Sequence, residues 1–167
     1  GYEQQKNLYV FFSNNNSCIR RTIWEKIPFR EVEMSEDQWW AQDILEQGYV
    51  KCYEPTALVY HSHTYTTIGW FKRQFDEYRA YSKLGLVDKV SIKSAIKSIV
   101  SLSTQNIRLI AQTSNLTKLN KIYWSMRRLF INIGIVSGQF LGARHTHRLV
   151  KTGQNLFSEQ FQKINQK

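Results

Sequence analysis

Met34-Ser35-Glu36-Asp37-Gln38-Trp39-Trp40 is the stretch around which the other parts of this 167-residue chain are organised. Ser35 and Gln38 have the spacing of a capping box, in which the serine hydroxyl and the glutamine side chain each bond a backbone N–H group of the first turn. Gly48 is the residue type that most readily ends a helix in the left-handed conformation. We therefore predict a helix over about residues 36–47, with two acids in its first turn.

The two acids of this helix have different orientations. With a step of 100° per residue, Asp37 falls in the middle of the apolar face, whereas Glu36 lies about a quarter-turn away. Partial burial would raise the pKa of Asp37, and the helix N-terminus would favour its ionised form. A carboxylate held between these effects suits a general base that deprotonates a hydroxyl, although first-turn acids also occur simply because they complement the helix dipole. The apolar face consists of Trp40, Ala41, Ile44 and Leu45.

Trp39 and the pair His61 and His63 are candidates for contact with a substrate or a metal. Trp39 points away from the apolar face, so its indole either stacks on a sugar ring or packs under a neighbouring loop. His61 and His63 flank Ser62 at the end of a predicted strand, where period-2 alternation places both imidazoles on one side. The pair either helps to bind a divalent metal, with carboxylates from elsewhere, or is an ordinary surface or core pair.

Two cations follow an asparagine-rich turn. The turn is Ser13-Asn14-Asn15-Asn16-Ser17, and Arg20 and Arg21 open the short helix after it. Side chains of this kind beside a turn can bind a diphosphate, and they are otherwise solvated surface charges.

The two cysteines give no disulfide framework, which favours a reducing, cytoplasmic compartment. A structural zinc site from Cys18, Cys52, His61 and His63 is a weaker alternative, because no Cys-x-x-Cys pairing is present.

The composition is that of a folded chain with an uneven distribution of charge. Hydrophobic residues make up 42% and aromatic residues 14% of the sequence, which argues against disorder. The net charge is +10, yet Glu159 is the only acid from Lys89 onward. Such a surface attracts polyanions: nucleic acid, anionic lipid or phosphorylated small molecules. Charge therefore separates two segments with different roles.

The hydrophobic pattern predicts an α+β chain that is mostly helical. Short strands are expected at residues 8–12, 49–53 and 57–60, where aromatic and β-branched residues are bounded by turn residues. Longer helices are expected at about residues 66–84, 91–112 and 116–142, and the last of these contains a glycine-spaced apolar segment. We divide the chain into an acidic segment 1–88, a basic helical module 89–150 and a polar tail 151–167.

The basic helical module admits two interpretations. Apolar faces combined with many Lys and Arg residues are typical of helices that lie on an anionic membrane surface. The alternative is a helical pair that packs against the rest of the protein, with its charges merely solvated. A nucleic-acid-binding module and a membrane adaptor without catalysis are the competing function classes. The pattern argues against nucleic acid, because the aromatics gather in the acidic segment and the cations in the other.

Several motifs in one order resemble the C-terminal part of bacterial family 2 glycosyltransferases of the rhamnosyltransferase type. The resemblance spans about residues 8–85 and extends more weakly into residues 124–144. Its motifs are Phe12-Ser13-Asn14-Asn15-Asn16-Ser17-Cys18-Ile19-Arg20-Arg21, Trp24-Glu25-Lys26-Ile27-Pro28-Phe29, Glu36-Asp37-Gln38-Trp39-Trp40-Ala41, Gly48-Tyr49, Tyr53-Glu54-Pro55 and Val59-Tyr60-His61-Ser62-His63.

The resemblance implies a GT-A fold, of which residues 1–88 would be the acceptor-side and catalytic part. It implies an inverting reaction with Asp37 as the base and Glu36 in support. His61, with His63 second, would assist a divalent metal (Mg or Mn) or the diphosphate. The implied donor is a nucleotide-diphospho-sugar such as dTDP-rhamnose, and the acceptor is a surface glycan, often lipid-linked. The candidate substrate-binding residues are Trp39, Trp40, Asn16, Arg20 and Arg21.

The chain departs from the family pattern at the donor side. No Asp-x-Asp motif occurs in the 167 residues, and no run of alternating strands and helices precedes residue 8. We therefore expect a fragment that is inactive alone and that self-associates through its bare sheet edge. The expected location of the whole enzyme is cytoplasmic, peripheral at the inner face of the cell membrane.

Overall fold

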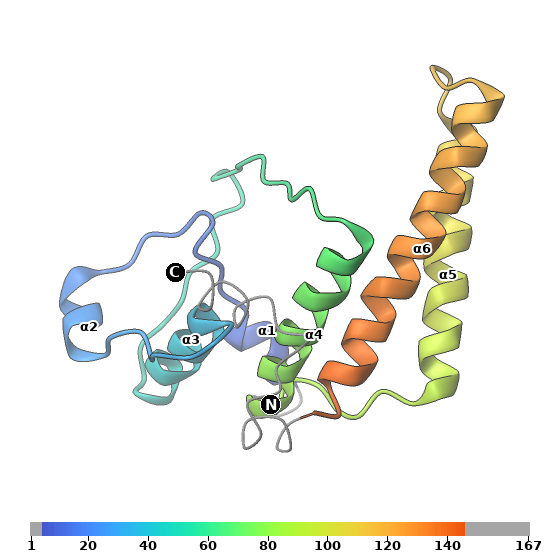
Figure 1. Ribbon diagram of the computed structural model, residues 1–167. Helices are drawn as coiled ribbons and strands as arrows, with labels where there is room; N and C mark the ends of the chain where they lie inside the picture. The colour runs from blue at the N-terminus through green and yellow to red at the C-terminus, as the bar shows by residue number, and fades with distance from the viewer. Residues whose placement is uncertain (1–4, 146–167) are drawn as a thin grey trace, which may run out of the picture. The chain divides into compact units, whose positions relative to one another are not determined.

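The computed structural model describes residues 5–145, which contain six helices and no strand (Figure 1). The chain divides into two compact units, with the boundary between Thr64 and Tyr65. The first unit holds α1 (Lys6–Val10), α2 (Arg21–Lys26) and α3 (Glu36–Glu46). The second holds α4 (Thr67–Lys83), α5 (Ile92–Gln112) and α6 (Lys118–Gly142).

This boundary lies earlier than the division that we drew at residue 88 from charge. Helix α4 belongs with the two basic helices because it packs along α6. The change in charge near residue 88 shows where the acidic residues end. The packing of the helices sets the boundary between the units, and it lies before α4. The polar tail 151–167 lies outside the described residues.

The first unit is built around the indole of Trp40, on the buried face of α3. The rings of Phe12 and Phe29 each lie with their centroids 5.4 Å from that of Trp40. The indole Nε1 donates a hydrogen bond of 2.6 Å to the carbonyl oxygen of Ile27. Ile44 completes the buried cluster, so the predicted inward face of this helix is confirmed.

The two ends of α3 differ in how well the sequence predicted them. The helix ends at Glu46, and Gly48 follows with φ +80°, as expected for a glycine that closes a helix. The capping box is wrong: Ser35 has a left-handed backbone (φ 61°), and its hydroxyl makes no capping bond. A serine that caps a helix normally has an extended backbone, which directs its hydroxyl at the N–H groups of the first turn. Ser35 does not have this backbone conformation. The Gln38 side chain instead donates to the carbonyl oxygen of Phe12 at 2.5 Å.

The strands expected at residues 8–12, 49–53 and 57–60 are absent from the described part of the chain. Residues 6–10 form α1, and the other two segments are irregular. A strand is stable only if a neighbouring strand bonds its backbone, and residues 5–145 offer none. Instead of a neighbouring strand, the side chain of Lys51 bonds the backbone at the end of α1. Its Nζ donates to the carbonyl oxygen of Tyr9 at 2.6 Å and to that of Phe11.

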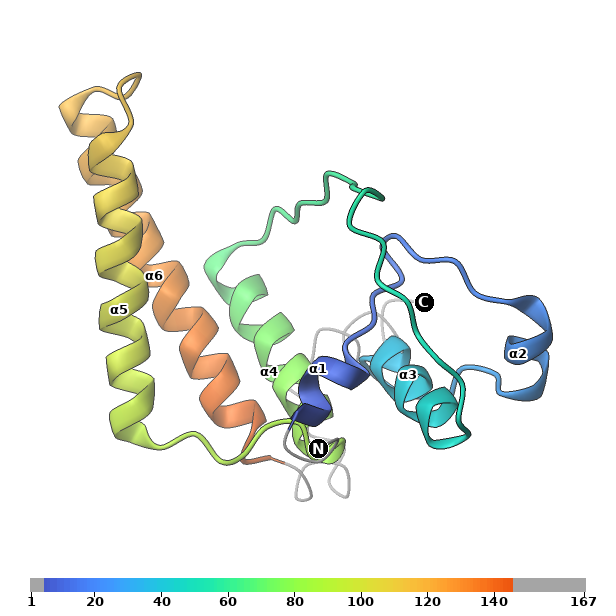
Figure 2. The same ribbon diagram turned by 180° about the vertical axis from the view of Figure 1, so that it is seen from behind.

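The three longer helices confirm the sequence prediction closely. Each begins with a hydroxyl that accepts a hydrogen bond from the first turn: Thr66 from Gly69, Ser91 from Ser94, and Thr117 from Asn120. Figures 1 and 2 show α5 and α6 side by side as an antiparallel hairpin, with α4 along the other side of α6. No helix within the described residues has the length and hydropathy that crossing a membrane requires.

The contact between α4 and α6 depends on glycines. Gly134, Gly138 and Gly142 recur every four residues and therefore share one face of α6. A Cβ atom at Gly134 would lie 2.9 Å from the carbonyl oxygen of Thr67. One at Gly138 or Gly142 would overlap the carbonyl oxygen of Phe71 or Phe75. The two backbones can approach this closely only because no side chain stands between them.

Polar side chains join α5 to α6 inside the hairpin. The buried Asn132 donates through Nδ2 to the hydroxyl of Ser103 at 3.2 Å. Its Oδ1 accepts from Nδ2 of Asn106 at 3.4 Å, and Asn106 in turn accepts from Arg128. At the tip, Lys121 donates to the carbonyl oxygen of Ala111. These bonds fix the alignment of the two helices, because a shift by one residue would leave Asn132 buried without its partners.

We predict that Gly138→Ala destabilises the protein by about 1–3 kcal/mol, the usual cost of overpacking. Alanine is the better helix former, so propensity alone predicts the opposite sign. Urea unfolding followed by circular dichroism measures the change. Ser137→Ala, one position away, is the matched control and should change stability by about 0.5 kcal/mol or less. A Gly138→Ala protein as stable as the wild type would show that the backbones do not touch here.

Candidate functional site

The Asp37 carboxylate lies half-buried at the start of α3, where two backbone N–H groups reach it. Its Oδ1 accepts from the N–H of Gln38 at 2.9 Å, within its own helix. Its Oδ2 accepts from the N–H of Asn14 at 3.4 Å, which comes from the asparagine-rich turn 23 residues earlier. The carboxylate therefore joins the helix N-terminus to that turn.

The electrostatics of this carboxylate agree with the balance expected from sequence. Burial raises the pKa of Asp37, and the neighbouring charge of Glu36 raises the pKa further. The N–H groups of Gln38 and Asn14 favour the ionised form and act in the opposite direction. The net effect is a pKa above the usual range for an aspartate. A carboxylate of this kind accepts a proton more readily than a solvated one.

The asparagine-rich turn also reaches the segment that carries the two histidines. Nδ2 of Asn16 donates to the carbonyl oxygen of Ala57 at 2.7 Å. Four residues after Ala57, His61 and His63 bring their Nε2 atoms to 2.7 Å from each other, with ring centroids 4.3 Å apart. The imidazoles thus lie together, as expected, although the backbone here is not a strand. One turn therefore contacts both candidate elements of the site.

The histidine pair fits part of a metal site. Two ligand atoms at adjacent positions of an octahedral metal, each at about 2.1 Å, stand about 3.0 Å apart, so the pair needs only a small opening. Residues 5–145 contain no group of three His, Cys, Asp or Glu side chains that could hold a metal ion. Cys18 and Cys52 are exposed and do not complete such a group. Within the described residues, no further side chain of these types completes a metal site with His61 and His63.

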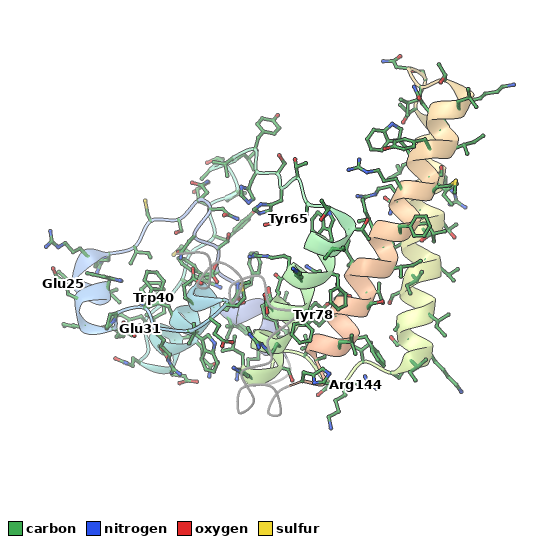
Figure 3. All side chains as sticks on the ribbon, viewed as in Figure 1. Glu25, Glu31, Trp40, Tyr65, Tyr78 and Arg144 are labelled. Carbon is green, nitrogen blue, oxygen red and sulfur yellow. The ribbon has the colours of Figure 1, made fainter. Side chains whose placement is uncertain are left out.

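The two adjacent tryptophans have separate environments. Trp40, labelled in Figure 3, is 4% exposed and bonded to Ile27, so it packs the core and offers no surface to a substrate. Trp39 is partly exposed, and the guanidinium of Arg30 lies 4.8 Å from its ring centroid. Arg30 also bonds the Asp43 carboxylate with two nitrogens. A sugar that stacked on this face of Trp39 would therefore have to displace Arg30.

Arg20 and Arg21 are both exposed at the start of α2. Arg21 donates to Glu25, four residues later, at 2.7 Å. Exposed ion pairs of this type contribute little to stability, so the guanidinium can exchange its partner at little cost.

Sequence reasoning missed the backbone of Asn14 and the side chain of Arg30. The bond from Asn14 to Asp37 uses a main-chain N–H, which any residue except proline would supply, so no residue type could signal it. Arg30 had a signal that we did not use. It stands directly before the acids Glu31 and Glu33, and it precedes a helix with an acid on its outer face.

Part of the chain is similar to curated sugar transferases. It is 38% identical over 69 residues to the O-antigen chain rhamnosyltransferase RfbN of Salmonella typhimurium, covering 40% of this chain and 22% of that protein. It is 36% identical over 70 residues to the O-antigen chain rhamnosyltransferase WbaN of Salmonella anatum, with the same coverage. The chain thus spans about a fifth of the length of these relatives. No protein-family model and no solved structure matches it.

We predict that the Asp37 carboxyl titrates above the ordinary value of about 3.9 and that Glu36→Gln lowers its pKa. The reason is that the charge of Glu36 disfavours the ionised form of its neighbour. Carbon-detected NMR titration of the side-chain carboxyls measures both values. Glu46→Gln, at the other end of α3, is the control and should leave Asp37 unchanged. A titration at or below 3.9 in the wild type would contradict the assignment.

The same shift predicts a pH dependence of stability. The folded protein binds the Asp37 proton more tightly than the unfolded chain does. This group therefore contributes to the free energy of unfolding at low pH, and the contribution is lost as pH rises from about 4 through the raised pKa. The Asp37→Asn protein lacks that loss. The wild type should therefore become less stable relative to Asp37→Asn between pH 4 and pH 7, as measured by urea unfolding. A constant difference over this range would contradict the prediction.

Proposed function

We propose that this chain is the acceptor-side part of an inverting glycosyltransferase of the rhamnosyltransferase type, built as a GT-A fold of family 2. The donor is a nucleotide-diphospho-sugar, with dTDP-rhamnose the first candidate. The acceptor is a glycan or a lipid-linked glycan in the synthesis of a surface polysaccharide. The observation that carries the proposal is the half-buried Asp37 carboxylate, held by Asn14 in a chain similar to two O-antigen rhamnosyltransferases.

In the proposed reaction Asp37 acts as the general base. Its carboxylate takes the proton of the acceptor hydroxyl while that oxygen forms a bond to the anomeric carbon of the donor sugar. The bond between this carbon and the diphosphate oxygen breaks, and the diphosphate leaves with the electron pair. Attack from the face opposite the leaving group inverts the anomeric centre. The N–H groups of Gln38 and Asn14 fix the direction in which the carboxylate points.

Glu36 supports the base by keeping its proton affinity high. Its charge is the second cause of the raised pKa of Asp37, after burial. Trp39, Asn16, Arg20 and Arg21 are the proposed substrate contacts. Trp39 stacks on a sugar after Arg30 moves, and the two arginines bind phosphate oxygens.

His61, with His63 second, is the proposed ligand of a divalent metal, Mg or Mn. Such a metal neutralises the charge that develops on a leaving diphosphate. The two imidazoles, whose Nε2 atoms lie 2.7 Å apart, would be the nitrogen ligands that this part of the chain offers to the metal. We place the working enzyme in the cytoplasm, at the inner face of the cell membrane, where a lipid-linked acceptor is accessible.

The decisive experiment measures transfer of rhamnose from dTDP-rhamnose to a lipid-linked acceptor by the full-length gene product, with residues numbered as here. Asp37→Asn should lower kcat by about 10²–10⁴-fold, the range attributed to general-base catalysis. Donor binding, measured by calorimetry, should not change, because the base contacts the acceptor. Glu36→Gln should lower kcat less, since it only reduces the basicity of Asp37.

Glu46→Gln is the matched control for this experiment. Glu46 is an exposed acid on the same helix, and its substitution should leave kcat within about twofold of the wild type. Retained transfer by Asp37→Asn would exclude this residue as the base. Absence of transfer by the wild type with rhamnose donors would refute the donor assignment.

A further inference from the structure

An exposed apolar stripe runs along α5. The stripe consists of Ile96, Val100 and Ile107, whose side chains are 46–60% exposed. Counted from Asn106, their positions are −10, −6 and +1. Asn106 points into the hairpin, where it bonds Asn132 of α6. With 100° per residue, the three apolar side chains lie about 80–120° round the helix from the contact with α6.

Helix α6 repeats this pattern at the same spacing. Counted from Asn132, the positions −10, −6 and +1 are occupied by Ile122, Met126 and Ile133. They are 39–58% exposed, and Phe130, at 56%, lies beside them. The glycines that contact α4 lie on a different face, about 140° further round, so α4 does not cover this stripe.

The two stripes form one surface of the hairpin. Both are displaced from the interhelical contact in the same rotational sense. In an antiparallel pair the two helices point in opposite directions, so the same rotation brings both stripes to the same side. We call this surface the hairpin face, formed by Ile96, Val100, Ile107, Ile122, Met126, Phe130 and Ile133.

Only positive charge borders the hairpin face. Residues 89–145 contain no Asp or Glu. Lys93 and Lys97 lie about 40–80° from the centre of the stripe on α5, and Lys118 lies at a similar angle on α6. The long side chains of these lysines can extend past the apolar residues to a layer of anionic groups.

We propose that the hairpin face docks on an anionic lipid bilayer, with its apolar side chains among the upper acyl chains and its lysines at the headgroup phosphates. Docking of this kind requires an apolar centre and a cationic border. The hairpin face supplies the first, and the lysines beside it supply the second. A second copy of this chain is a poorer occupant, because pairing two hairpin faces would bring together lysine borders without any acid to offset them. This inference deepens the proposed function, which puts the enzyme at a membrane, and its test is separate because docking requires neither donor nor acceptor.

The test is co-sedimentation of the 167-residue protein with vesicles of phosphatidylcholine that contain about 30% phosphatidylglycerol. We expect binding at low salt that weakens as salt is raised, and much weaker binding to pure phosphatidylcholine. Ile107→Glu should weaken binding about tenfold or more, because it places a charge in the apolar centre. The Lys93→Gln, Lys97→Gln double variant should lose about fivefold per lysine at low salt.

Leu109→Glu is the matched control. Leu109 lies two residues after Ile107, is 64% exposed, and points about 200° further round α5, away from the hairpin face. It should bind vesicles like the wild type. Circular dichroism of each variant checks that the helices are intact, and the lysine variant tests the same face if Ile107→Glu fails to fold.

Three results would overturn the proposal. The first is no binding to anionic vesicles at low salt. The second is an equal loss in Ile107→Glu and Leu109→Glu, which would show that added negative charge, and not the face, decides binding. The third is a stable dimer in sedimentation velocity that Ile107→Glu dissociates, which would assign the face to a second copy of the chain. None of these results depends on whether the protein transfers sugar.

Discussion

The first unit depends on the burial of one indole. Trp40 packs between Phe12 and Phe29, which come from segments on either side of α2, and its N–H bonds the chain at Ile27. These contacts draw the segments before and after α2 onto α3. They also place the start of α3 beside the asparagine-rich turn, because Phe12 directly precedes that turn. The position of Asp37 relative to Asn14 is therefore a consequence of how Trp40 packs.

The second unit is organised by a different constraint, the absence of side chains at Gly134, Gly138 and Gly142. Close backbone contact gives α4 and α6 many dispersion contacts without a large apolar core. This leaves the larger apolar side chains of α6 free to face elsewhere, and several of them are exposed. The two units thus satisfy the same need for burial in opposite ways, one with aromatic rings and the other with glycine.

The sequence predicted what local patterns determine and failed where distant segments decide. The helices at residues 67–83, 92–112 and 118–142 combine apolar periodicity with a Ser or Thr cap, so both their existence and their starts were predictable. The segment at residues 8–12 has the composition of a strand, but a strand needs a partner that the described residues do not contain. The inward aim of Asp37 followed from the helical wheel. Its bond to Asn14 did not, because it links main chain to side chain across 23 residues.

The glycine contact also has a mechanical consequence. Because no side chain stands between the backbones of α4 and α6 at these three glycines, a change in the tilt of one helix would alter the backbone contact with the other. Thr67, the first residue of α4, is also the residue that touches Gly134, and only three residues separate it from His63. The glycines of α6 thus fix where α4 begins along the hairpin, since a side chain at Gly134 would meet Thr67.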